Sequence, residues 1–162
     1  MASAAERPLR ASVLDRLLDP LGEGRREPTI GVRELKAAVA RDLEWLLNTK
    51  TVLVHDDRLA ALTEARESIL TYGLPDFTTS SWRNPNDTRR ICGEIAAAIK
   101  AFEPRLAPST VRVSLVPARD ALDFRTRFRI EATLCVEPIS EPVYFDSSVQ
   151  FGTGAIQIEE TS

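Results

Sequence analysis

The hydrophobic pattern of this 162-residue chain changes its period once, near residue 111. Before that point apolar residues recur every three or four positions, as they do along one face of an α-helix. After it they alternate with polar residues, as in a strand with one buried face. Helices followed by strands predict an α+β fold, with N-terminal helices packed on a mostly antiparallel C-terminal sheet. The length suits a single domain with its own core.

Two helices are expected in the first half of the chain. The clearer one spans residues 32–47, where one stripe is apolar. The second is expected over 59–71 and is stopped by Gly73 and Pro75, because glycine accepts the left-handed conformation after a helix and proline cannot continue one. The residues expected to face the core are Leu35, Val39, Leu43 and Leu46 in the first helix, and Leu62, Ala65, Ile69 and Leu70 in the second.

A third helix is expected to begin with Asn86 as its cap and to end before Pro104, which pushes the preceding residue out of the helical region. Its core-facing residues are Ile91, Cys92, Ile95, Ile99 and Phe102. Cys92 and Cys135 are the only two cysteines, and both lie within apolar patterns. We therefore expect buried free thiols rather than a disulfide.

The last third of the chain is predicted to form β-strands. Residues 111–116 and 124–136 alternate in polarity and are joined by a hairpin connection at 117–123. Two further strands or half-strands are expected at 143–151 and 155–160. The final one could lie at the edge of the sheet, and an open edge can accept a strand from another chain.

The N-terminal segment SVLDRLLDP predicts a short helix, capped by Ser12 and ended by Pro20, with Leu14, Leu17 and Leu18 on its apolar face. Isolated helices this short are marginal in water, so it must dock, either on its own domain or on another chain. Residues 21–29 contain two glycines and a proline and are typical of a flexible linker. We therefore divide the chain into a docking helix and linker at 1–28 and an α+β domain at 29–162.

Few motifs in the sequence indicate catalysis or cofactor binding. His55 is the single histidine, and neither a Gly-x-Ser-x-Gly elbow nor a phosphate-binding glycine loop accompanies it. The net charge of −3 gives no support for nucleic-acid binding. No apolar run approaches the ~20 residues that span a membrane. We expect no cofactor, no metal, no nucleic-acid partner and no direct membrane insertion.

The segment AFEPRL, residues 101–106, carries the sharpest functional question. Glu103 beside Phe102 could be the proton donor of a glycosidase, which needs two carboxylates across a sugar. Arg105 opposes this role, because a nearby positive charge favours the ionised acid, and no obvious second carboxylate is present. Pro104 instead fixes a rigid corner, and arginine is well suited to ion pairs at interfaces. The segment is therefore better interpreted as a structural or partner-binding corner.

Several motifs, in this order, resemble the TssE family of type VI secretion baseplate subunits, which is related to a wedge protein of contractile-tailed phages. They are SVLDRLLD, RDLEWLLNT, SILTYGLPDF, the helix into FEPRL, and EPVYFDSSV. The resemblance implies a structural protein and not an enzyme, located in the cytoplasm at the membrane-proximal baseplate. It implies contacts with TssF, TssG and TssK, and a connection to the sheath of TssB and TssC, whose assembly begins by strand pairing.

The resemblance also assigns partner-binding residues. It links the Glu-Pro-Arg motif to baseplate contacts, the N-terminal helix to wedge docking, and the C-terminal strands to sheath pairing. These residues are Glu103, Pro104, Arg105, Leu14, Leu17, Leu18, Ile156 and Ile158. Two alternatives stay open at this point: a muramidase that cleaves peptidoglycan through Glu103, and a small regulatory adaptor built on the same fold.

Overall fold

The computed structural model describes residues 9, 11–18, 30–51, 64, 68–77, 80, 84–117, 126–137, 139–149 and 154–161. The elements, in chain order, are α1 (Val13–Leu18), α2 (Val32–Asn48), η2 (Ile69–Thr71), α4 (Pro85–Phe102), β1 (Arg112–Val116), β2 (Thr126–Val136), β3 (Ile139–Val149) and β4 (Ile156–Thr161). Helices precede strands, so the predicted α+β order is confirmed.

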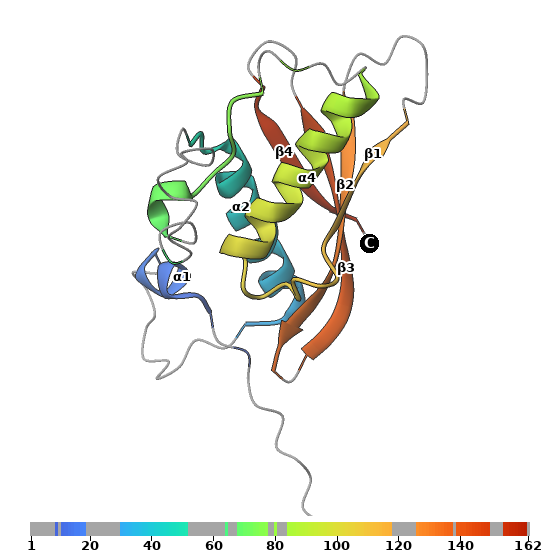
Figure 1. Ribbon diagram of the computed structural model, residues 1–162. Coiled ribbons are helices and arrows are strands. Elements are labelled where there is room, and N and C mark those ends of the chain that lie inside the picture. Colours follow the sequence, from blue (N-terminus) through green and yellow to red (C-terminus); the bar gives the residue numbers. More distant parts are fainter. Residues whose placement is uncertain are drawn as a thin grey trace, which may run out of the picture.

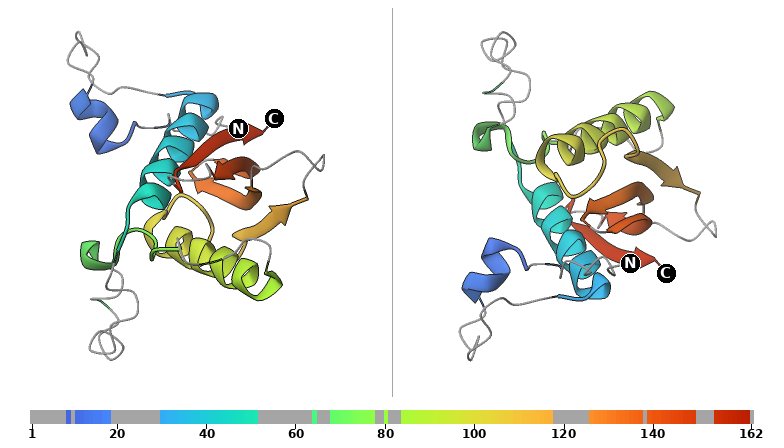
Figure 2. Two further views of the ribbon diagram at one scale, coloured as in Figure 1. Left: turned by 90° about the horizontal axis from the view of Figure 1, so that it is seen from above. Right: turned by 90° about the horizontal axis from the view of Figure 1, so that it is seen from below.

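The four strands form one antiparallel sheet in the order β1-β2-β3-β4, which leaves β1 and β4 as its edges. The two long helices lie on one face of this sheet (Figures 1 and 2). α2 packs against β4, and α4 packs against β1. α1 and η2 lie on the side of the long helices away from the sheet, so they are not part of the helix-sheet interface.

The core lies between the two long helices and the sheet. The apolar stripes predicted for residues 32–47 and for the third helix are confirmed at their central positions. The fully or almost fully buried residues include Leu35, Val39, Leu43 and Leu46 of α2, Ile91, Ile95 and Ile99 of α4, and Phe128, Ile130 and Leu134 of β2. Each such side chain contributes about 1.5–3 kcal/mol by leaving water, which makes this layer the main source of stability.

The predicted helix over 59–71 is wrong at its C-terminal end. The described residues there form only the 3₁₀ turn η2, and Ile69 and Leu70, both predicted to face the core, are 87% and 58% exposed. The Ser68 hydroxyl accepts a hydrogen bond from the Leu70 amide and starts a new turn, in which Thr71 is the buried residue. Leu62 and Ala65 lie outside the described residues.

Gly73 has the role that the stop signal predicts. Its φ is +115°, a conformation that side-chain-bearing residues rarely adopt. A Cβ here would also lie 2.4 Å from the Thr49 carbonyl oxygen. The missing side chain lets Leu74 and residues 49–51 exchange backbone hydrogen bonds of 2.8 and 2.9 Å. This fastens the end of α2 to the segment that carries Tyr72.

Two smaller predictions are corrected. Asn84, not Asn86, caps α4: its side chain accepts a hydrogen bond from the Asn86 amide, and Pro85 occupies the first helical position, which proline favours. Both cysteines are free, but Cys135 is exposed and Cys92 is only half-buried. Strand alternation places Cys135 on the face opposite the buried Leu134.

Candidate partner-binding site

The Glu-Pro-Arg corner begins where α4 ends. Phe102 is the last helical residue, and the Glu103 amide still donates to the Ile99 carbonyl at 2.9 Å. The chain then turns, with a 3.2 Å hydrogen bond from the Leu106 amide to the Glu103 carbonyl. The fully buried Leu106 forms a bridge with Leu134 of β2. The corner is therefore anchored at one end in a helix and at the other in the sheet.

Glu103 and Arg105 form a bidentate ion pair within this corner. Arg105 Nε lies 2.7 Å from Glu103 Oε1, and Arg105 Nη2 lies 2.5 Å from Glu103 Oε2. The Arg105 backbone amide also donates to Glu103 Oε1 at 3.1 Å. Glu103 is buried. Since a buried charge is costly unless it is paired and hydrogen-bonded, the arginine stabilises the position of this carboxylate.

Asp42 of α2 joins the same guanidinium. Arg105 Nη2 lies 2.6 Å from Asp42 Oδ2, which ties the end of α4 to the middle of α2. Burial opposes the positive charge of Arg105, but hydrogen bonds and attraction from Glu103 and Asp42 outweigh it and raise the pKa of Arg105. The arginine is therefore held as a permanent cation between two carboxylates.

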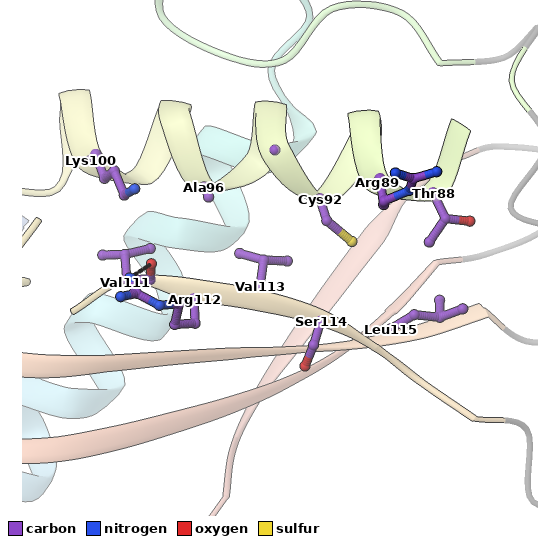
Figure 3. Close-up of a pocket in the computed structure, with 11 residues that line it drawn as sticks. Thr88, Arg89, Cys92, Ala96, Lys100, Val111, Arg112, Val113, Ser114 and Leu115 are labelled. Carbon is purple, nitrogen blue, oxygen red and sulfur yellow. Dashed lines mark hydrogen bonds between the residues drawn. The ribbon is translucent and has the colours of Figure 1, made fainter. Parts of the chain in front are cut away.

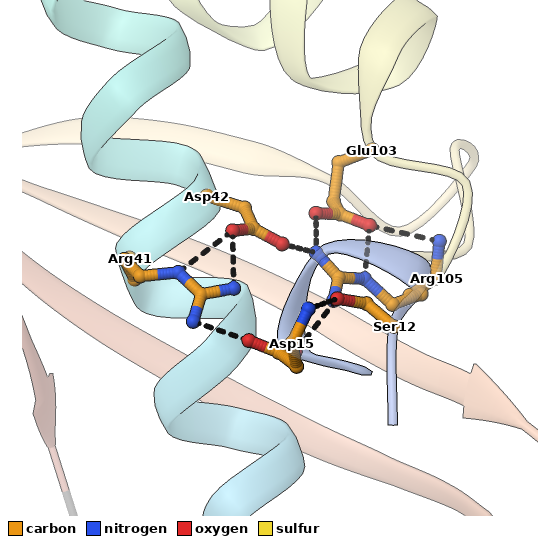
Figure 4. A network of polar contacts seen from close by, with 6 residues as sticks. All are labelled: Ser12, Asp15, Arg41, Asp42, Glu103 and Arg105. Atoms are coloured by element: carbon orange, nitrogen blue, oxygen red, sulfur yellow. Dashed lines mark hydrogen bonds and ion pairs between the residues drawn. The ribbon is translucent and has the colours of Figure 1, made fainter. Parts of the chain in front are cut away.

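The network continues from α2 to α1 (Figure 4). Arg41 donates to Asp42 Oδ1 from Nε and Nη2 at 3.0 and 2.8 Å, and from Nη1 to Asp15 Oδ1 at 2.6 Å. The Ser12 hydroxyl donates to Asp15 Oδ2 at 2.7 Å and accepts from the Asp15 amide at 3.1 Å. The hydrogen bond from Arg41 is the main cause of a lowered pKa at Asp15, and Asp15 in turn raises the pKa of Arg41.

A hollow of about 400 Å³ lies beside this network. Pro104, Arg105 and Leu14 line it together with Trp45 and Tyr72. The Tyr72 and Phe102 rings meet edge to face at 5.2 Å, and the Arg41 guanidinium lies 5.0 Å from the centre of the Trp45 ring. The hollow thus combines an aromatic wall with a charged rim, a combination typical of protein interfaces.

The structure brings together only some of the predicted partner-binding residues. Glu103, Pro104, Arg105 and Leu14 all line the one hollow. Leu17 does not line it and is 76% exposed, and the side chain of Leu18 is outside the described part of the chain. Ile156 and Ile158 lie apart on β4 with buried side chains.

The β4 edge, predicted to pair with another chain, is partly occupied by α2. Asn48 Oδ1 accepts from the Ile156 amide at 2.9 Å, and Asn48 Nδ2 donates to the Ile156 carbonyl at 2.7 Å. Glu44 Oε2 accepts from the Ile158 amide at 3.0 Å. These helix side chains bind the backbone groups that a neighbouring strand would otherwise bind.

The sequence interpretation missed Arg41 and Asp42, although α2 contains a signal for them. Asp42 is seven residues from Leu35 and so falls on the buried stripe of this helix. An acid at a stripe position needs a cation nearby, because acids are rarely buried unless they are paired. Which cation serves this role depends on the packing of α4 against α2, which the local pattern does not determine.

The arrangement does not favour acid catalysis at Glu103. Both of its side-chain oxygens accept hydrogen bonds from Arg105, so the buried carboxylate is held as an acceptor and not as a proton donor. Among the described residues, no group of three or more His, Cys, Asp and Glu side chains could hold a metal ion. His55 lies outside the described residues.

The family model of the baseplate wedge protein gp25 matches residues 33–138, which is more than half of the chain. The chain belongs to this family. The match to the gp25 family begins within α2 and extends beyond β2, so it includes Arg41, Asp42 and the Glu-Pro-Arg corner. Membership supports a structural role in a baseplate, in contact with other baseplate components.

Neither the curated proteins nor the solved structures provide a significant match to the chain. The gp25 family match leaves α1, β3 and β4 outside its limits. No helix in the described part of this gp25-family chain is long and apolar enough to cross a membrane.

Proposed function

We propose that this protein is the gp25-type subunit of a type VI secretion baseplate, a TssE-like structural protein that joins the baseplate wedge to the contractile sheath. The observation that supports it best is the Glu-Pro-Arg corner, which lies inside the region matched by the gp25 family and beside a hollow with an aromatic wall. We propose TssF, TssG and TssK as its baseplate partners, and TssB and TssC as its sheath partners. Its place is the cytoplasmic, membrane-proximal end of the machine.

The corner acts by holding a binding surface rigid. Glu103 and Arg105 satisfy each other, and Asp42 fixes Arg105 to α2, so the hollow beside them keeps its shape before a partner arrives. A preorganised surface loses less entropy on binding than a flexible one. Pro104 is exposed at this corner and available for contact. The partner surface that fits is apolar at its centre, to fill the hollow, and polar where it meets the charged rim.

α1 extends the same surface. Asp15 binds Arg41, and Leu14 lines the hollow, whereas Val13 and Leu17 are 72% and 76% exposed. A six-residue helix with exposed apolar side chains gains stability when a second chain covers them. We propose that residues 1–28 serve as a docking arm for the wedge and that residues 29–162 form the domain that carries it.

The test is an affinity pull-down from cells that express the baseplate and sheath subunits of a type VI system, with the partners identified by mass. Leu14→Asp introduces a charge into the hollow, and Trp45→Ala removes part of its wall. We expect each variant to reduce recovery of TssF, TssG and TssK by roughly tenfold, the factor that corresponds to about 1.4 kcal/mol. Tyr144→Ala is the matched control, because Tyr144 is exposed on the sheet face opposite the helices.

The pull-down separates this proposal from the alternatives. Recovery of TssF, TssG and TssK that is unchanged in both hollow variants would refute the hollow as the docking surface. Recovery of unrelated proteins and no baseplate subunit would favour a regulatory adaptor. The proposed function is structural and not enzymatic, so a cell-wall suspension should keep its turbidity when this protein is added. Turbidity loss that disappears in Glu103→Gln would support the muramidase instead.

A further inference from the structure

A second groove lies between α4 and β1 (Figure 3). Its volume is about 410 Å³, and we call it the α4–β1 groove. Figure 3 shows the strand running alongside the helix, with Val111 at the Lys100 end and Leu115 at the Arg89 end. The groove shares no lining residue with the hollow beside the Glu-Pro-Arg corner, so the two are separate surfaces.

The strand side of the groove is apolar and only partly covered. Val113 and Leu115 pair with Ile130 and Phe128 of β2, so they lie on the face of the sheet that the helices cover. Ile130 and Phe128 are fully buried, whereas Val113 is half-buried and Leu115 is 40% exposed. The helix layer therefore covers this face at β2 and leaves part of it open at β1.

The helix side of the groove has small residues between two cations. Arg89, Gly93, Ala96 and Lys100 are spaced by four, three and four positions, so they form one stripe along α4. Ala96 is half-buried and the other three are exposed. The distance between packed helices depends on the side chains at the contact, so Gly93 and Ala96 allow a second helix to approach closely.

Gly93 is not explained by packing within the described chain. A glycine inside a helix costs about 0.5–1 kcal/mol relative to alanine. A Cβ at this position would meet nothing within 4 Å, so no described neighbour requires its absence. A partner that packs against α4 at this point would account for the glycine.

The charge of the groove indicates the chemistry of the occupant. Arg89, Lys100 and Arg112 line it, and no acidic residue is among the described residues that do. Lys100 has no hydrogen bond or ion pair with a described residue. Arg89 donates to the Pro85 carbonyl and the Asn86 side chain, and Arg112 donates only to backbone carbonyls. Three cations without a described carboxylate partner, in a chain with a net charge of −3, favour an acidic occupant.

The positions of Arg89 and Lys100 favour a helical occupant. They are eleven positions apart on one stripe, which corresponds to about 16 Å along the helix axis. A helix lying along α4 places an apolar stripe and its flanking acids on one side, so the acids can reach both cations while the stripe fills the groove. In an extended segment, acids that alternate with the groove-filling residues would point away from α4.

We propose that the α4–β1 groove binds an acidic amphipathic helix of another protein, which packs beside α4 on the face of the sheet that the helices cover. Its apolar side chains cover Val113 and Leu115, and its acids meet Arg89 and Lys100. The proposal goes beyond the proposed function, because it gives the protein a second docking surface that can be occupied while the hollow is also filled.

The test is direct binding to the purified full-length protein, followed by fluorescence anisotropy. The probe is a labelled peptide of about 20 residues, since shorter isolated helices are marginal, with a stripe of leucines flanked by glutamates. One control peptide carries lysine in place of glutamate, and another has the same composition in an order that breaks the stripe. We expect the probe to bind roughly tenfold more tightly than either control, and its affinity to fall as salt is raised. Equal affinity for the three peptides would overturn the proposal.

The conformation of the bound peptide separates a helix from an extended segment. Circular dichroism of the mixture should show a gain of helix over the sum of the two components. A peptide of alternating valine and glutamate should bind roughly tenfold more weakly than the probe. Equal or tighter binding of this peptide, or no gain of helix with the probe, would reject the helical occupant.

Lys100→Glu places the probe on the protein. Reversing this charge should weaken binding of the glutamate peptide roughly tenfold and strengthen binding of the lysine peptide. Arg33→Glu is the matched control, because it makes the same change of charge at an exposed position of α2 outside the groove. Equal effects of the two variants would mean that only the net charge matters, and would refute the site.

Gly93→Trp tests the groove without changing its charge. The indole fills the space beside Ala96, so we expect binding to weaken roughly tenfold. Gly93→Ala is its control and should retain most of the affinity, because the added Cβ meets nothing within 4 Å. Unchanged binding in a Gly93→Trp protein that is folded by circular dichroism would contradict the proposal.

Leu14→Asp separates this groove from the docking hollow. Leu14 lines the hollow and not the α4–β1 groove, so the variant should bind the probe as the unaltered protein does. Loss of probe binding in Leu14→Asp would place the peptide in the hollow and refute the groove. Retained binding together with reduced recovery of TssF, TssG and TssK would support two independent surfaces.

Discussion

Arg105 Nη2 lies 2.6 Å from Asp42 Oδ2, and this contact joins two residues that are 63 positions apart in sequence. The same nitrogen binds Glu103, so one guanidinium links the end of α4, the middle of α2 and the buried acid of the corner. Since Asp42 also binds Arg41, which binds Asp15, the shape of the hollow depends on a chain of alternating charges. Substitution of Asp42, in the middle of this network, should lower the stability of the fold. Loss of the charge of Asp15, at its end, should loosen the contact of α1 with α2.

Asp42→Ala removes the central acid of this network. It leaves Arg105 with Glu103 alone and Arg41 with Asp15 alone. We expect the free energy of unfolding to fall by about 1–3 kcal/mol, the usual cost of leaving a half-buried charged partner unsatisfied. Urea denaturation followed by circular dichroism measures this.

Lys50→Ala is the control for Asp42→Ala, since Lys50 is exposed and lies 3.6 Å from Asp76. Exposed ion pairs are worth about 0–1 kcal/mol. Equal losses in the two variants would mean that the network contributes no more than a surface pair.

Asp15 should make the docking of α1 sensitive to acid. Its pKa is lowered in the folded protein from an ordinary value of 3.8, chiefly by the hydrogen bond from Arg41. A lowered folded pKa adds stability that is present above the unfolded value and is lost as pH falls through the folded value. The α1 contact should therefore be intact at neutral pH and loosen only below about pH 4.

The acid transition can be followed by NMR through the Asp15 amide, which donates to the hydroxyl of Ser12, the residue before α1. We expect its chemical shift to change below about pH 4 in the unaltered protein and to stay flat in Asp15→Asn, which cannot titrate. A transition of the same size in Asp15→Asn would mean that another group controls α1.

Gly73→Ala should be markedly destabilising. The residue has φ of +115°, and an added Cβ would lie 2.4 Å from the Thr49 carbonyl oxygen. Strained backbone of this kind costs on the order of 1–3 kcal/mol, and the clash adds to it. Gly154→Ala is a matched control, because φ is +69° there but nothing lies within 4 Å of the added Cβ. Thermal unfolding should show the larger loss of stability in Gly73→Ala. Equal losses in the two variants would mean that the close approach of residue 73 to Thr49 adds no cost.

The local sequence pattern predicts the features that depend only on residues close together in the sequence. The stripes of α2 and α4, the helix end at Phe102 and the alternation in β2 all follow from spacing and from Pro104. Two features depend on contacts between distant segments and could not be predicted in this way. The first is the choice of Asp42 as a partner of Arg105, and the second is the occupation of the β4 edge by side chains of α2.

Asn48 provides the most direct test of how the chain protects its β4 edge. Its side-chain amide accepts from and donates to the backbone of Ile156, much as a residue of a neighbouring strand would. Asn48→Ala leaves both groups of Ile156 without this partner. We expect a loss of about 1–3 kcal/mol in the free energy of unfolding and increased self-association, because free strand edges pair with one another. Asn48→Asp keeps the acceptor for the Ile156 amide and loses the donor, so it should show a smaller change in both. Analytical ultracentrifugation and urea denaturation measure the two effects, and an Asn48→Ala protein that stays monomeric with unchanged stability would contradict a protective role for Asn48.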